Sequence, residues 1–339
     1  MFKRIIALFS LAGLISLPQW TTAQEVNVYS ARKEALILPL LDTFSEKTGI
    51  KVNLITGNAD ALIVRMANEG KFSPSDILLT TDVGRLVRAK EQGLTQAYTS
   101  KIVEQAVPSH LRDSQNHWIG LTLRARPLMI APDRVDAGSL TSLEDLAAPK
   151  WKGKICIRSS GNIYNQSMVA ALLEQLGEEK TASVVQGIVD NFARPPMGGD
   201  RDQIKAVAAG QCDIAIANTY YLAGMLAGSD VAQTAAAKKV SVIWPNQQNR
   251  GTHINISGAA IARHSKNIKE AQQLIDFMLS VEAQRWYADT NFEYPVRTNV
   301  ATNSVLKSFG DFKSEQIPLE KVGELNGAAV KLMDRAGWK

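Results

Sequence analysis

The stretch VNVYSARKEALILPLLDTFSEKTGIKVNLI, residues 26–55, decides the fold class of this chain. Residues 26–29 predict a short strand, and leucines at helical spacing predict a helix over residues 34–46. Gly49 ends that helix, and apolar and polar residues then alternate over 50–55, as they do in a strand. Strand, helix, strand is the repeating unit of α/β folds.

The same alternation continues along the chain. Further strands are predicted at 76–80, 154–157, 212–217 and 240–244, and further helices at 62–66, 83–92, 166–176, 180–192 and 266–287. This order predicts parallel sheets with helices on both faces.

Two local features have a structural interpretation. Asp200 followed by Gln203 predicts a capping box at the start of a helix that runs through Ala209. The extended runs 118–123 and 128–131 flank Pro127, which disfavours helix at the residue before it, and they suit strands that cross between two lobes. Residues 251–256, leading to the apolar run 259–262, complete the pattern.

The N-terminus has the pattern of a secretory signal. Lys3 and Arg4 precede an apolar run over residues 5–17, which is too short to span a bilayer. Small residues at 21–23 predict cleavage after Ala23, and an uncleaved anchor is the alternative. No cysteine lies at the cut, which argues against a lipid anchor. We therefore expect residues 1–23 to be a signal peptide and the mature protein to be periplasmic.

Length and charge limit the classes of function. Removal of Lys3 and Arg4 takes the formal charge from +5 to +3, which is no signature of nucleic-acid binding. The remaining 316 residues, 339 less 23, exceed what one hydrophobic core usually serves, so two lobes are expected. No segment after the signal is apolar enough to cross a membrane.

The chain has two cysteines, Cys156 and Cys212, both inside apolar strand-like runs. An oxidising compartment permits a disulfide between them if the strands are adjacent. Two buried free thiols are the alternative, since the sequence does not show how far apart the Cα atoms lie.

Common catalytic signatures are missing from the sequence. There is no CxxC, no HExxH, no Gly-x-Ser-x-Gly and no Walker loop. The four histidines are not spaced as ligands on one helix face, so a His-based zinc site is not predicted. A secreted hydrolase remains an alternative, but no nucleophile with a base at readable spacing supports it.

Three tyrosines follow predicted strands. Tyr164 comes after the strand 154–157, and Tyr220 with Tyr221 comes after the strand 212–217. Ligands of open parallel sheets bind at the carboxyl ends of strands, so these phenols can converge. A phenolate is a hard anionic donor that suits Fe(III), although such a pair in isolation is more often a packing or hydrogen-bonding pair.

Four longer segments change that balance: VNVYSARKE (26–34), SPSDILLT (73–80), CIRSSGNIYNQS (156–167) and ANTYY (217–221). They resemble the periplasmic ferric-iron-binding proteins of iron importers, the FbpA/FutA family, and the resemblance covers essentially the whole mature chain. It implies an α/β fold of the two-lobed periplasmic-binding-protein type (type II), with mixed sheets, helices on both faces and a hinged cleft. It also implies Fe(III) as cargo, with Tyr164, Tyr220 and Tyr221 as metal ligands.

The first segment departs from the family pattern. Many relatives have a histidine, or a histidine and a tyrosine, where this chain has Lys33 and Glu34, so a further ligand from this loop is in doubt. The resemblance implies that carbonate or bicarbonate fills the open iron positions, held by Arg32 with Arg124 beside it. An arginine fork matches such a planar anion.

Two further residues have competing interpretations. For Arg126 we favour a surface or hinge salt bridge over a role in anion binding. Asp60 lies where some relatives place a carboxylate ligand, but a helix N-terminal acid is explained by the helix dipole alone.

The resulting hypothesis is a solute-binding protein, not an enzyme, that delivers Fe(III) to the permease of an ABC importer. We expect the N-terminal lobe to comprise residues 24–123 and 251–301, and the C-terminal lobe residues 124–250 and 302–339. Neither nucleic acid nor a stable homo-oligomer is expected. A carrier of a polyamine or a small anion is the alternative within the same class.

Overall fold

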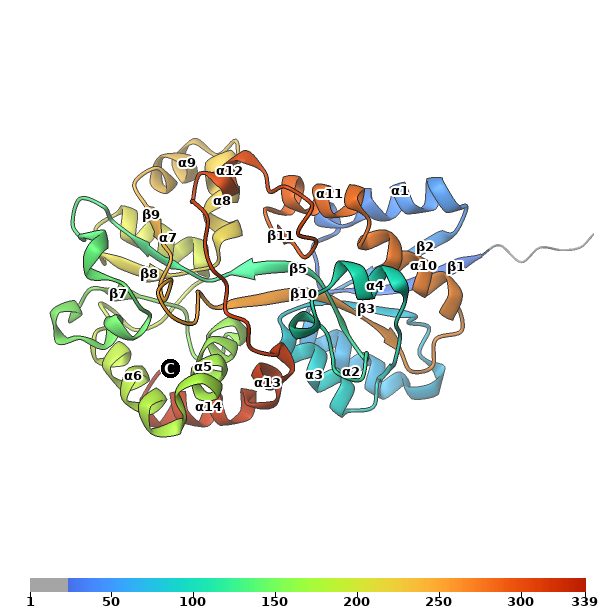
Figure 1. Cartoon of the computed structure of the whole chain (residues 1–339), viewed down its shortest axis with the longest axis horizontal. Coiled ribbons are helices and arrows are strands. Elements are labelled where there is room, and N and C mark those ends of the chain that lie inside the picture. The colour runs from blue at the N-terminus through green and yellow to red at the C-terminus, as the bar shows by residue number, and fades with distance from the viewer. Residues whose placement is uncertain (1–23) are drawn as a thin grey trace, which may run out of the picture.

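The computed structural model describes residues 24–339, in two lobes joined at their centre (Figure 1). The predicted signal peptide lies outside the described residues. Within residues 24–339, no helix is both long enough and apolar enough to cross a bilayer.

The first lobe is built on the larger sheet, whose strand order is β11-β5-β10-β3-β1-β2, with β4 paired to β10. Its strands are β1 (Glu25–Ser30), β2 (Lys51–Thr56), β3 (Ile77–Thr81), β4 (Thr95–Gln96), β5 (Ile119–Ala125), β10 (Ile254–Ala262) and β11 (Tyr294–Pro295). Its helices are α1 (Leu38–Thr48), α2 (Ala59–Glu69), α3 (Val83–Glu91), α4 (Lys101–Ala106), α10 (Ile268–Met278) and α11 (Val281–Asn291).

The second lobe is built on a four-stranded sheet of order β7-β8-β6-β9. Its strands are β6 (Leu128–Ile130), β7 (Ile155–Cys156), β8 (Ile214–Ile216) and β9 (Ser241–Ile243). Its helices are α5 (Ile163–Leu176), α6 (Glu178–Asp190), α7 (Asp200–Ala208), α8 (Thr219–Ala227), α9 (Val231–Ala237), α12 (Ser304–Lys307), α13 (Leu319–Glu324) and α14 (Asn326–Arg335). Helix α13 packs against both α3 and α5, so the C-terminal segment contacts both lobes.

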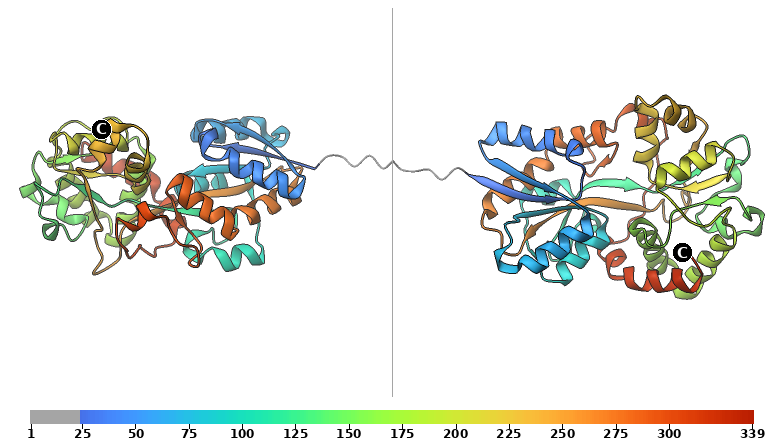
Figure 2. Two further views of the ribbon diagram at one scale, coloured as in Figure 1. Left: turned by 90° about the horizontal axis from the view of Figure 1, so that it is seen from above. Right: turned by 180° about the vertical axis from the view of Figure 1, so that it is seen from behind.

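Two extended segments join the lobes side by side. Strand β5 continues through Arg126 and Pro127 into β6, and the chain returns through β10, which pairs antiparallel with β5. The backbone N–H of Arg126 donates to the carbonyl of His253, 3.0 Å away, so the two segments also bond between the lobes. The views from above and behind show these segments between the lobes (Figure 2).

The strand and helix order predicted parallel sheets, but both sheets also contain antiparallel pairs, and the mixed sheets implied by the resemblance are confirmed. Strand β1 is parallel to β2 and β3, and β7 is parallel to β8. Strand β10 returns from the second lobe, and it therefore runs antiparallel to β3 and β5.

Two predicted helix starts are also corrected. The helix expected over 34–46 is a 3-10 turn, Glu34–Leu36, followed by α1, with Pro39 in its first turn. Proline lacks an N–H and is tolerated only there, so the α-helix begins late. Helix α7 is capped by Gly199, whose N–H donates to Asp202, and not by an Asp200–Gln203 box. The Asp200 carboxylate is instead buried among arginines.

Candidate metal centre

The three candidate ligands lie in the first turns of two helices. Tyr164 is the second residue of α5, where Asn162 caps the helix by accepting the N–H of Tyr164. Tyr220 and Tyr221 follow Thr219 at the start of α8. Because the preceding strands β7 and β8 are parallel neighbours, both helices begin at one edge of the sheet.

One buried guanidinium group lies against these rings. The Cζ atom of Arg124 is 4.3 Å from the ring centroid of Tyr220 and 5.0 Å from that of Tyr164. The centroids of Tyr220 and Tyr221 are 4.3 Å apart. The structure therefore brings the three predicted phenols and Arg124 together.

The three phenols differ in how easily they ionise. Burial alone would raise the pKa of Tyr164, but the positive charge of Arg124 and the hydroxyl of Tyr220 outweigh it and lower this pKa to about 8. Burial raises the pKa of Tyr220 well above its ordinary value. Burial and the nearby Tyr164 and Asp200 raise the pKa of Tyr221 to about 12. Tyr164 is thus the phenol closest to ionisation at neutral pH.

Glu293 connects the two predicted anion-binding arginines. Its carboxylate accepts two hydrogen bonds from Arg32, at 3.2 and 2.6 Å, and lies 3.4 Å from Nε of Arg124. Thr122 and Ser257 also donate to it. Burial would raise the pKa of Glu293, but the two arginines and Thr122 hold it below its usual range. The carboxylate is therefore a fixed negative charge that orients both guanidinium groups.

Arg126 is buried, whereas a salt bridge on the surface was one of the two positions predicted for it. Its Nη1 atom lies 3.2 Å from Asp200 Oδ2, which makes a buried ion pair between the crossing segment and α7. Arg158 approaches the other oxygen of Asp200 at 3.6 Å.

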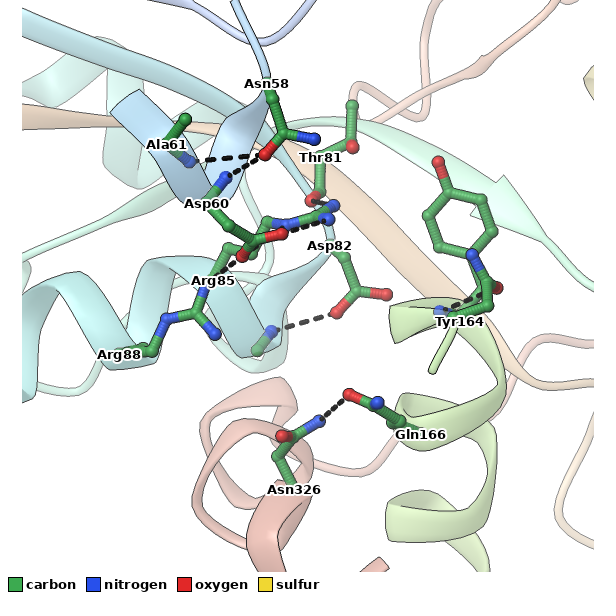
Figure 3. A network of polar contacts seen from close by, with 12 residues as sticks. Asn58, Asp60, Ala61, Thr81, Asp82, Arg85, Arg88, Tyr164, Gln166 and Asn326 are labelled. Carbon is green, nitrogen blue, oxygen red and sulfur yellow. Dashed lines mark hydrogen bonds and ion pairs between the residues drawn. The ribbon is translucent and has the colours of Figure 1, made fainter. Parts of the chain in front are cut away.

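Asp60 is paired with other side chains, and Glu34 is exposed. The carboxylate of Asp60 pairs with Arg85, 2.9 Å away, and with Arg88 (Figure 3). Burial would raise the pKa of Asp60, but the two arginines outweigh it and lower this pKa. Glu34 lies exposed in the 3-10 turn. The charge of Asp60 is thus already paired with two arginines.

The two cysteines are joined by a disulfide, with Cα atoms 5.9 Å apart. Cys156 ends β7 and Cys212 precedes β8, so the bond links the two strands that lead to the candidate ligands. Among residues 24–339, no group of three or more His, Cys, Asp or Glu could hold a metal.

Sequence reasoning missed several residues of this site, among them Asn165, Asp200, Asn218 and Glu293. Asn165 and Asn218 lie inside two of the segments that carry the family resemblance, which was the available signal. Glu293 is 261 positions from Arg32, so no local spacing connects them.

The fold and site define a bacterial extracellular binding protein. A sequence profile of the family described as "Bacterial extracellular solute-binding protein" matches residues 73–311. The chain belongs to this family, and the predicted fold class is confirmed.

Several of the relatives are iron proteins. The chain is 46% identical to "Iron uptake protein A1" of Synechocystis over 316 residues, which covers 93% of this chain and 88% of that protein. It is 29% identical to the "Fe(3+)-binding periplasmic protein" of Serratia marcescens over 93% of this chain and 90% of that one.

Solved structures agree with these relatives. The Trichodesmium FutA (IdiA), in complex with iron and citrate, superposes with a TM-score of 0.91 and 46% identity, covering 93% of this chain and 100% of that one. The ferric binding protein from Campylobacter jejuni gives a TM-score of 0.88 at 38% identity, with coverage of 93% and 100%. The resemblance to the FbpA/FutA family is confirmed.

Proposed function

We propose that this protein captures Fe(III) in a cleft between its lobes and delivers it to the permease of an ABC importer. The observation that carries the proposal is the gathering of Tyr164, Tyr220 and Tyr221 around the buried Arg124. Iron is the cargo of a carrier here, and no catalytic role is proposed. The iron relatives, similar over 93% of this chain, support the choice of cargo.

The three phenols are the proposed ligands, because phenolate oxygen is a hard donor that matches a hard trivalent cation. Three phenolates neutralise the charge of Fe(III) and leave coordination positions open. Arg32 and Arg124 with Glu293 add a net charge of +1, from two cations and one anion. A carbonate-type anion bound at these arginines would complete the coordination; bicarbonate would balance the charge, and carbonate would leave a net charge of −1.

Arg124 is well placed to hold that anion. It is buried, and its Nε atom, 3.4 Å from Glu293, makes no hydrogen bond within residues 24–339. Arg32 uses both terminal nitrogens on Glu293, so it would share the anion through their remaining protons. Glu293 would then set the direction in which both arginines face the anion.

We further propose hinge closure as the capture mechanism, with lobes that comprise residues 24–123 with 251–301 and residues 124–250 with 302–339. The two sheets and the pair of crossing segments support these boundaries. The tyrosines come from the second lobe and Arg32 from the first, so anion and metal would stabilise the closed form. The protein would act in the periplasm as a monomer, after removal of residues 1–23.

The electrostatics disfavour a carrier of organic cations. In the described part of the chain, two carboxylates of the site, Glu293 and Asp200, are each paired with arginine. Arg124 itself lies over two of the aromatic faces that a cation would use.

The test is a titration of purified protein with ferric nitrilotriacetate, with and without bicarbonate, followed by visible absorption and metal analysis. Phenolate bound to Fe(III) gives a visible band, and we expect one that depends on bicarbonate. Tyr221→Phe should weaken the band and the affinity, whereas Tyr98→Phe, a buried tyrosine bonded to Asp276 in the first lobe, should not. No visible band in the unmodified protein would refute the proposed function.

A further inference from the structure

Arg126 has more polar partners than an ion pair requires. Its Nη1 atom donates to Asp200 Oδ2 at 3.2 Å and to Asn218 Oδ1 at 3.1 Å, and Nη2 donates to Asn165 Oδ1 at 2.5 Å. The side chain is 2% exposed. A single buried guanidinium group thus contacts three separate elements of the second lobe.

Each partner is next to a candidate ligand or its loop. Asn165 follows Tyr164 in the first turn of α5, and Asn218 precedes Tyr220 by two residues. The Asp200 carboxylate also accepts the backbone N–H of Asn218, at 3.0 Å. Arg126 therefore connects the two loops that carry the tyrosines.

The same contacts fix the direction of the Asn218 amide. A guanidinium group has only donors, so the Oδ1 atom of Asn218 must face Arg126. The Nδ2 atom then faces the hydroxyl oxygen of Tyr220, 3.1 Å away, and donates to it. A donor held against a phenol oxygen stabilises the negative charge that the oxygen carries when it binds a metal.

On the other side, the Asn165 amide closes the loop before α5. Its oxygen is held by Arg126, and its Nδ2 atom donates to the carbonyls of Arg158 and Ser159, at 2.9 and 3.1 Å. The loop that leads to Tyr164 is thus fixed by bonds that begin at Arg126.

Stability alone is a weak reason to bury this ion pair. Replacement of a buried pair by well-packed apolar residues is often neutral or stabilising. The planar fork of arginine can bridge two amides and a carboxylate at once, and lysine offers a point charge that cannot do so in the same geometry.

We propose that Arg126 is a positioning residue of the metal site, which holds the Tyr164 and Tyr220 loops in register and presents the Asn218 donor to the Tyr220 oxygen. This inference rests on the proposed function, because it assumes that these phenols bind Fe(III). Arg126 does not contact the metal and acts through Asn165, Asn218 and Asp200.

The first test compares Arg126→Lys with Arg250→Lys. Lysine keeps the charge beside Asp200 but loses the bridge between the amides. Arg250 makes a two-bond pair with Glu144 in the same lobe and shares none of the Arg126 hydrogen bonds described above, so it is the matched control. We expect Arg126→Lys to lower the affinity for Fe(III), measured by competition with nitrilotriacetate, at least tenfold and to shift the visible band. Arg250→Lys should change neither.

The second test is Asn218→Asp, which keeps nearly the same shape and the acceptor for Arg126. It replaces the donor that faces Tyr220 by a negatively charged acceptor, which repels a phenolate. We expect at least a tenfold loss of affinity and a shifted band in a protein whose circular dichroism matches that of the unmodified chain. Because this variant retains the Arg126 contact, it tests the oriented amide even if Arg126→Lys fails to fold.

The outcomes separate the two proposals. If the unmodified protein gives no visible band with Fe(III), the proposed function fails. Suppose instead that the unmodified protein gives the band. If Arg126→Lys and Asn218→Asp both fold and leave the wavelength of the band and the affinity for Fe(III) unchanged, iron binding stands and the positioning role of Arg126 is refuted. Unchanged binding in Asn218→Asp alone, where Arg126→Lys does not fold, also overturns the proposal.

Discussion

The Oγ atom of Ser167 donates a 2.6 Å hydrogen bond to the carboxylate of Asp82, and the two residues belong to different lobes. Asp82 follows β3 in the first lobe, and Ser167 lies in α5 of the second. Asp82 has a positive φ of 78° and also accepts from the N–H of Gly84 and from Asn255. Burial raises the pKa of Asp82 despite these donors. This bond is a direct polar link between the lobes.

Removal of this link should destabilise the structure. Ser167→Ala leaves a buried oxygen of Asp82 short of a donor, which costs about 1–3 kcal/mol of unfolding free energy. Chemical denaturation followed by circular dichroism measures the loss. Ser308→Ala, an exposed serine bonded only to a nearby carbonyl, is the control. A loss in Ser167→Ala no larger than in the control would contradict the assigned bond.

Glu293 should be one source of the pH dependence of stability. The pKa of Glu293 is lower in the folded protein than in the unfolded chain. Its contribution to the free energy of unfolding is therefore present above about pH 4.3 and is lost as the pH falls through the pKa of the folded state. Glu293→Gln should cost about 3–5 kcal/mol at pH 7, because the buried Arg124 and the partly buried Arg32 lose their counter-ion.

The difference between Glu293→Gln and the unmodified protein should shrink as the pH falls below about 4. Denaturation curves at pH 7 and at pH 3.5 measure it. Glu282→Gln, which breaks an exposed pair with Lys47, should have almost no effect at either pH. A constant difference at both pH values would argue against an ionised Glu293.

Tyr164 should ionise before the other site tyrosines. Arg124 and the Tyr220 hydroxyl overcome the effect of burial and lower the pKa of Tyr164 to about 8, and the pKa of Tyr221 is raised to about 12. Metal-free protein should therefore show one phenolate step near pH 8 in ultraviolet difference absorption, and Tyr164→Phe should lack it. Since Fe(III) must displace these protons, its affinity should fall as the pH falls below 8. A titration of Tyr164→Phe identical to that of the unmodified protein would exclude this assignment.

The disulfide should stabilise the second lobe. Cys156 and Cys212 close a loop with a sequence separation of 56. In the chain-entropy account, replacement of both by serine costs about 4 kcal/mol. Denaturation with and without reductant measures this cost, and the double-serine protein should be insensitive to reductant. Equal stability of the two proteins would show that the bond contributes nothing.

The sequence determined the local structure and the chemistry of the ligands. Hydrophobic periodicity located the strand 26–29 and the helix 83–92 close to their observed bounds, because helix and strand faces are set by residues a few positions apart. Tyr164, Tyr220 and Tyr221 were found because each follows a predicted strand and lies in a segment that resembles a known family.

Only the tertiary structure decided how the charges are paired. Glu293 joins Arg32 across 261 positions, and Asp200, which the sequence suggested as a helix cap, is buried against Arg126. Such pairings form where β5 and β10 bring distant segments together, and local spacing carries no information about them. The ligand types could therefore be read from the sequence, whereas the groups that orient them and set their pKa values followed from the fold alone.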